Sequence, residues 1–231
     1  MPLFKPLLAG ANLPDRLVAS LGAAIGIALT IVVCANLPLA ASDLPIIVAP
    51  LGASAVLVFA VPSSPLAQPW SVLGGNVIST LVGVAAYHAV PQPPVAAGIA
   101  VGGAILVMSL LRCLHPPGGA AALTAVIGGE SIHAAGYQFA FAPIGLNSIA
   151  LLAVAMMFHR YSGHLYPHIP ADLPPVRPAT GIQSTDVDRA LEDMHESFDI
   201  SRADLDALLA HAERHAAART GAARTPVRGS I

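Results

Sequence analysis

At residues 114–123 the chain reads LHPPGGAAAL, an imidazole followed by two helix breakers, two glycines and a helix-forming alanine run. Two adjacent prolines fix φ and remove two backbone donors, so one helix is predicted to end near His115 and the next to begin at Pro117. Because the free N–H groups of a helix start favour negative charge, this start is a candidate anion site. The same arrangement is predicted at residues 49–56, APLGASAV, with a helix beginning at Pro50.

The composition places this stretch inside a bilayer. Of the 231 residues, 55% are hydrophobic and 10% are charged, against about 25% charged in soluble domains. Between residues 17 and 158 the charged residues are Asp43, Arg112 and Glu130, and most of the others follow Arg160. This indicates an integral membrane domain followed by a soluble tail. The formal net charge of −2 points to no partner, because the charge is segregated along the chain.

The membrane domain is predicted to contain about six helical segments. Four are apolar for about 20 residues, enough to cross ~30 Å of hydrocarbon, and they are residues 17–37, 72–90, 95–114 and 139–158. Two others are interrupted or short, and they are residues 44–61 and 117–129. The predicted fold class is therefore an all-α membrane protein.

The segments form two similar halves, each a long helix, a broken short helix and another helix. Residues 50–56 align with residues 117–123 at an offset of 67 residues (117 − 50), and Asn76 and Asn147 occupy similar places in the third helix of each half. Paired proline- and glycine-interrupted segments at matching positions are typical of a transporter's substrate site. Broken backbone at membrane depth is tolerated only where protein buries it or water reaches it.

Two topologies fit this repeat. If all three segments of each half cross the membrane, the halves are inverted relative to each other. If the short segments enter and return, four segments cross and the halves are parallel. We prefer the six-segment inverted arrangement. Both put the two ends of the chain on one side, which Lys5, Arg16 and Arg160 place in the cytoplasm.

Three separated motifs resemble the HPP family of integral membrane proteins. They are the His-Pro-Pro-Gly-Gly run at 115–119, residues 49–55 and the segment PSSPLAQP at 62–69, and they occur in the family's order. The resemblance covers residues 16–160 and implies a bacterial inner-membrane protein linked to nitrite transport. Many bacterial members carry a pair of CBS domains after the membrane part, and residues 186–219 resemble the helical linker that leads into those domains.

The candidate site combines the two predicted helix starts. Ser54 can donate through its hydroxyl, and His115 can donate as a neutral imidazole or become cationic. Glycines let an ion approach the backbone closely, and a weak site suits conduction. The candidate substrate-binding residues are Pro50, Gly52, Ala53, Ser54, Asn76, His115, Pro116, Pro117, Gly118 and Gly119, with Arg112 as a vestibule residue that attracts anions.

Each of these residues also has a purely structural interpretation. His115 can bond a backbone carbonyl freed by the double proline, and Ser54 can bond back within its own helix. Asn76 can hold helices together, and the glycines can serve close helix packing alone. Arg112 can equally extend its side chain to the headgroups.

The chain is predicted to divide into a transmembrane domain (residues 1–165), a proline-rich connector (166–185) and a cytoplasmic helical tail (186–231). Two amphipathic helices are expected in the tail, with apolar faces formed by Val187, Leu191 and Met194 and by Leu205, Leu208 and Leu209. Ser201 and Asp204 predict a capping box before the second helix.

The predicted function is a transporter or channel for a small inorganic anion bound near the midplane at paired helix starts, and the family resemblance implies that this anion is nitrite. The alternative is a non-transporting membrane sensor that signals through the tail. No His-Glu-x-x-His, nucleophile elbow or acidic pair within the spans points to an enzyme. We expect no cofactor and no metal. The expected partners are the lipid bilayer, a small anion and further copies of the chain, with no nucleic acid.

Overall fold

The computed structural model describes residues 13–36, 44–170, 182–195 and 198–223. Their regular secondary structure is entirely helical, which confirms the all-α prediction. The chain divides into two compact units, Met1–His168 and Ile169–Ile231. Lys5, Asp43 and most of the proline-rich connector lie outside the described residues.

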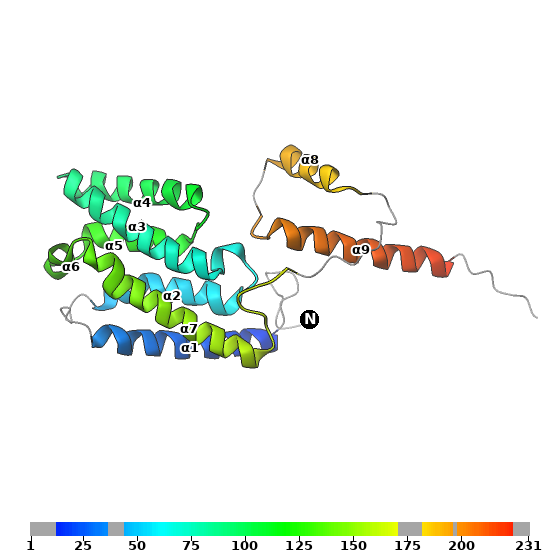
Figure 1. The fold of residues 1–231 in the computed structure, drawn as a ribbon, viewed down its shortest axis with the longest axis horizontal. Helices are drawn as coiled ribbons and strands as arrows, with labels where there is room; N and C mark the ends of the chain where they lie inside the picture. Colours follow the sequence, from blue (N-terminus) through cyan, green and yellow to red (C-terminus); the bar gives the residue numbers. More distant parts are fainter. Residues whose placement is uncertain (1–12, 37–43, 171–181, 196–197, 224–231) are drawn as a thin grey trace, which may run out of the picture. The chain divides into compact units, whose positions relative to one another are not determined.

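The first unit is a bundle of apolar helices (Figure 1). Among the described residues, four helical stretches are long and apolar enough to cross a membrane, and two apolar helices are shorter, as predicted. The elements of the bundle are α1 (Leu13–Ala35), α2 (Leu44–Ala60), η2 (Pro65–Ala67), α3 (Pro69–Ala89), α4 (Pro93–Leu110), α5 (Pro116–Ile127), α6 (Glu130–Ala135), the π-helical turn η3 (Ala140–Gly145) and α7 (Leu146–Ser162).

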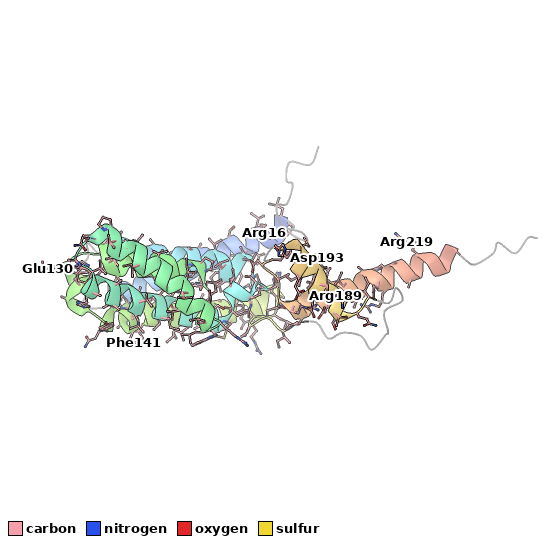
Figure 2. All side chains as sticks on the ribbon, turned by 90° about the horizontal axis from the view of Figure 1, so that it is seen from above. Arg16, Glu130, Phe141, Arg189, Asp193 and Arg219 are labelled. Carbon is pink, nitrogen blue, oxygen red and sulfur yellow. The ribbon has the colours of Figure 1, made fainter. Side chains whose placement is uncertain are left out.

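One end of the bundle collects the start of α1 and the ends of α2 and α7. Arg16 Nη1 donates to the Ala60 carbonyl at 2.6 Å, and His159 Nε2 lies 2.9 Å from the Val58 carbonyl oxygen. Figure 2 shows Arg16 and Glu130 at opposite ends of the bundle. Charged side chains therefore mark the two ends, and the first and last helices of the bundle meet at the Arg16 end.

Helix α5 starts near this end and leads to the other. Just before its start, His115 Nδ1 lies 2.8 Å from the carbonyl oxygen of Leu66 in η2. After it, His133 of α6 stacks on Tyr87 near the end of α3, with ring centroids 3.8 Å apart. The six-segment arrangement remains our prediction, and this course of α5 favours it over a segment that returns to its own side.

The third helix of each half packs against the other half. Helix α3 packs on α4 and α5, while α7 packs on α1 and α2. A Cβ atom added at Gly83 of α3 would lie 2.3 Å from the Ala122 carbonyl oxygen of α5, so only glycine permits this approach. Close contact at small residues is typical of membrane helix interfaces. Two related halves that each pack their third helix on the other half would give this pattern. The internal repeat itself stays a prediction.

Helix α2 corrects one prediction. It begins at Leu44 and continues through Pro50, so the predicted helix start at Pro50 is wrong. Proline inside a membrane helix is tolerated because neighbouring groups satisfy the freed backbone. The N–H groups that follow Pro50 therefore belong to a helix interior. The start predicted at Pro117 is found one residue earlier, at Pro116.

The second unit contains α8 (Ser184–Met194) and α9 (Arg202–Ala223). The Asp204 N–H donates to Ser201 Oγ at 3.0 Å, which confirms Ser201 as the cap of α9. Arg202 of α9 forms an ion pair with Asp188 of α8 at 2.9 Å. The apolar faces of the two helices enclose a groove of about 520 Å³, lined by Ile182, Asp186, Val187, Ala190, Leu191, Met194, Phe198, Ile200, Leu205 and Leu209.

Candidate functional site

Fully buried polar side chains gather where α2, α3, α7 and the start of α5 meet. We call this group the polar cluster, and its members, each 0% exposed, are Ser54, Asn76, Ser79, His115 and Ser148. Asn147, beside Ser148 in the first turn of α7, is also fully buried. Buried polar groups are costly in an apolar bundle and mark functional sites by default.

Two other elements hold the His115 ring. Nδ1 lies 2.8 Å from the Leu66 carbonyl oxygen, and Nε2 lies 2.8 Å from Ser54 Oγ. Because a carbonyl can only accept, Nδ1 carries a proton, and in the neutral ring Nε2 accepts from the Ser54 hydroxyl. His115 thus bonds a carbonyl, as its structural interpretation supposed, but that carbonyl belongs to η2 and not to the backbone freed by the prolines.

The loop between α2 and α3 presents the Leu66 carbonyl. Ser64 caps η2 by accepting from the Leu66 N–H at 3.1 Å. Gln68 Nε2 donates to the carbonyls of Pro62 and Ser64 at 2.9 and 2.8 Å. Side chains of the motif at residues 62–69 therefore fix the loop that orients His115.

Asn76 extends the hydrogen-bonded chain across α3. Its Nδ2 donates to Ser54 Oγ at 3.3 Å and to Ser148 Oγ at 3.2 Å, while its Oδ1 is buried without a partner. The chain therefore runs from the Leu66 carbonyl through His115, Ser54 and Asn76 to Ser148. It lies about 10 Å along α3 from the start of that helix, at 1.5 Å per residue.

Ser79 belongs to the cluster although the sequence analysis did not select it. Its buried hydroxyl has no partner, whereas Thr30, Thr80 and Thr124 each bond the carbonyl four residues earlier. A Cβ atom added at Gly118 would lie 2.6 Å from Ser79 Oγ, so this hydroxyl faces the first turn of α5. Its spacing of three residues from Asn76, which puts both on one helix face, is the signal that could have found it.

The start of α5 supplies fewer backbone donors than the sequence analysis supposed. Pro116 and the buried Pro117 have no N–H, and the Gly118 N–H donates to the His115 carbonyl at 2.8 Å. The α5 dipole still favours an anion, by ~0.3–1 kcal/mol. Side chains must therefore provide most of the donors of the candidate site.

Several predicted residues lie away from the polar cluster. Ala53, Arg112 and Pro116 are exposed. A Cβ atom added at Gly52 would meet open space, and one at Gly119 would face α4. The structure brings together His115, Ser54 and Asn76, with the Pro50 carbonyl 3.2 Å from Ser54 Oγ and Gly118 against Ser79.

The fold and the buried polar cluster define a polytopic helical membrane protein. The chain belongs to the HPP family, since the family described as HPP, transmembrane region, matches residues 9–167. This match confirms the resemblance found in the sequence motifs.

Two transmembrane proteins of Dictyostelium discoideum are similar to this chain. One is 38% identical over 114 residues, which are 48% of this chain and 36% of the relative. The other is 35% identical over 125 residues, which are 52% of this chain and 44% of the relative. The chain thus spans less than half the length of these relatives. No solved structure matches the chain.

Proposed function

We propose that this protein is a transporter or channel for a small inorganic anion, with nitrite as the favoured substrate. The observation that carries the proposal is the polar cluster, whose Ser79 hydroxyl is buried without a partner and can donate a hydrogen bond. A buried hydroxyl left without a partner costs about 1–3 kcal/mol. An unpartnered polar group inside a membrane bundle suits a ligand that binds there transiently.

The chemistry of the cluster fits a small anion. An imidazole, serine hydroxyls and a carboxamide can all donate hydrogen bonds, and α2, α3 and α5 carry no carboxylate that would repel an anion. No lysine or arginine lies in these helices either, so binding is weak, as conduction requires. Nitrite is the substrate that the family resemblance implies.

The orientation of the protein in the membrane follows from its charges. We place the bundle end with Arg16 and Arg160 in the cytoplasm of a bacterial inner membrane, because positive charge collects on the cytoplasmic side. Leu17 on α1 and Leu110 on α4 are 65% and 73% exposed. These apolar side chains face lipid or a neighbouring copy in a homo-oligomer.

Nitrite flux into liposomes that contain the purified protein tests this function. We expect Ser54→Ala to lower the wild-type flux about two- to thirteenfold, since one hydrogen bond contributes about 1 ± 0.5 kcal/mol. Ser109→Ala is the matched control, because the exposed Ser109 hydroxyl bonds only within its own helix, to the Ile105 carbonyl at 2.7 Å. We expect this control to transport like the wild type.

Wild-type flux no greater than in protein-free liposomes, from folded and inserted protein, would contradict the proposal. That result would favour the non-transporting sensor. Equal losses of nitrite flux in Ser54→Ala and Ser109→Ala would show that the polar cluster has no specific role in transport.

A further inference from the structure

We propose that each anion crosses together with one proton, and that His115 binds this proton. The inference rests on the proposed function and adds the co-transported species. It follows from the direction of the hydrogen bonds that join Leu66, His115, Ser54 and Asn76.

When His115 is neutral, the Leu66 carbonyl fixes the donor and acceptor of every hydrogen bond from His115 to Asn76. The carbonyl only accepts, so His115 Nδ1 holds the ring proton and Nε2 can only accept. The 2.8 Å contact between Nε2 and Ser54 Oγ then needs the serine hydrogen, and the serine oxygen accepts from Asn76 Nδ2. Asn76 consequently turns an acceptor, Oδ1, toward its unpartnered side. An anion on that side is repelled.

Adding a proton to His115 Nε2 reverses the donor and acceptor roles in the hydrogen bonds that join His115, Ser54 and Asn76. The Nε2–H now donates to Ser54 Oγ, and the Ser54 hydroxyl is free to donate to Asn76 Oδ1 after the carboxamide turns by half a rotation. Ser148 can donate to the same oxygen, because a hydroxyl both donates and accepts. The turn presents the Asn76 NH₂ group on the unpartnered side, one helical turn from Ser79. The imidazole gains one proton, and no other covalent bond changes.

A bound anion favours the state in which the hydrogen bonds are reversed and the Asn76 carboxamide is turned. The Ser54 hydroxyl has a second acceptor, the Pro50 carbonyl at 3.2 Å, which would leave Asn76 unturned. An anion beside Asn76 is repelled by Oδ1 and attracted by NH₂, so it favours the turned carboxamide. A buried imidazolium without a counterion is costly. Proton and anion therefore strengthen each other's binding, and this coupling is reciprocal.

The acidic side chains of the described bundle are Asp15 in the first turn of α1 and Glu130 in the first turn of α6, and neither belongs to an element that contributes to the polar cluster. Helices α2, α4 and α5 and the turn η2 carry no titratable side chain. The titratable groups of the other neighbouring segments are Tyr87 and His88 at the far end of α3, His159, Arg160 and Tyr161 at the end of α7, Tyr166, whose hydroxyl donates to the Ala67 carbonyl of η2, and Arg112 and Cys113 in the linker before His115.

Nitrite accumulation in liposomes containing the full chain tests the coupling under two separate gradients. Transport of one proton with one nitrite moves no net charge. Accumulation should therefore follow an imposed pH difference, about tenfold per pH unit, and should ignore a potassium–valinomycin potential. Uncoupled nitrite would instead redistribute about 50-fold per 100 mV. Protein-free liposomes supply the background, because neutral nitrous acid also crosses lipid.

The variant His115→Gln keeps a donor and an acceptor but has no titrating proton, and we expect it to lose the response to the pH difference. His88→Gln is its control, since His88 is exposed near the end of α3. Wild-type accumulation that follows the potential, or a full pH response in His115→Gln, would overturn the coupling while nitrite transport stands. No wild-type accumulation under either gradient would overturn the proposed function itself.

Discussion

Nitrite flux is expected to fall about 10- to 100-fold when His115 is replaced by alanine, because hydrogen bonds to charged groups contribute about 1.5–3 kcal/mol. His115 is the one member of the polar cluster that joins η2 to α2, through Leu66 and Ser54. Without the ring, Ser54 loses one of its hydrogen-bond partners and the polar cluster loses its titratable side chain. Flux into liposomes at matched protein density measures the effect.

The exposed His88 provides the control for this substitution. His88→Ala removes an imidazole near the far end of α3 and should leave flux near the wild-type value. Thermal unfolding of both variants in detergent shows whether a loss of flux reflects a loss of fold. Unchanged flux in folded His115→Ala protein would remove His115 from the transport path.

The largest effect on folding is expected for Gly83→Val. A Cβ atom at Gly83 would lie 2.3 Å from the Ala122 carbonyl oxygen and 2.9 Å from the Ala122 Cα, both backbone atoms that cannot turn aside. Overpacking of a core typically costs 1–3 kcal/mol and occasionally more, and here α3 and α5 must separate. We expect about 3 kcal/mol of destabilisation, seen as a much lower melting temperature or as the absence of monodisperse protein.

The same substitution at Gly98 is the matched control. A Cβ atom there would meet nothing within 4 Å, so Gly98→Val should melt close to the wild type. Similar melting temperatures for the two valine variants would show that the close contact between α3 and α5 does not hold the bundle together.

The features predicted correctly from the sequence are local ones. Long, mostly apolar runs predicted the four long helical stretches, and the double proline at 116–117 predicted the start of α5 to within one residue. His115 and Ser54 were predicted as site residues from their places at two helix starts. The start is found for His115, which precedes α5, whereas Ser54 lies inside α2. The structure brings these two side chains within 2.8 Å of each other, although 61 residues separate them.

The features that sequence reasoning missed depend on tertiary contacts. A proline such as Pro50 reads as a helix start, but neighbouring helices in a membrane protein let a helix continue through it. Ser79 has the sequence pattern of an ordinary helical serine that bonds back to its own helix, and only the structure shows that its hydroxyl lacks a partner and faces Gly118 of α5. The Leu66 carbonyl carries no side-chain signal at all.

The central claim is that the polar cluster binds the transported anion, and Ser79→Ala tests it most directly because Ser79 has no structural partner to lose. Thr80→Val is the matched control, since the adjacent buried hydroxyl bonds the Asn76 carbonyl at 2.8 Å. We predict that Ser79→Ala melts at or above the wild-type temperature yet carries nitrite several-fold more slowly. Thr80→Val should melt lower and transport at the wild-type rate per folded molecule. Wild-type flux in Ser79→Ala, with the loss confined to Thr80→Val, would contradict the account.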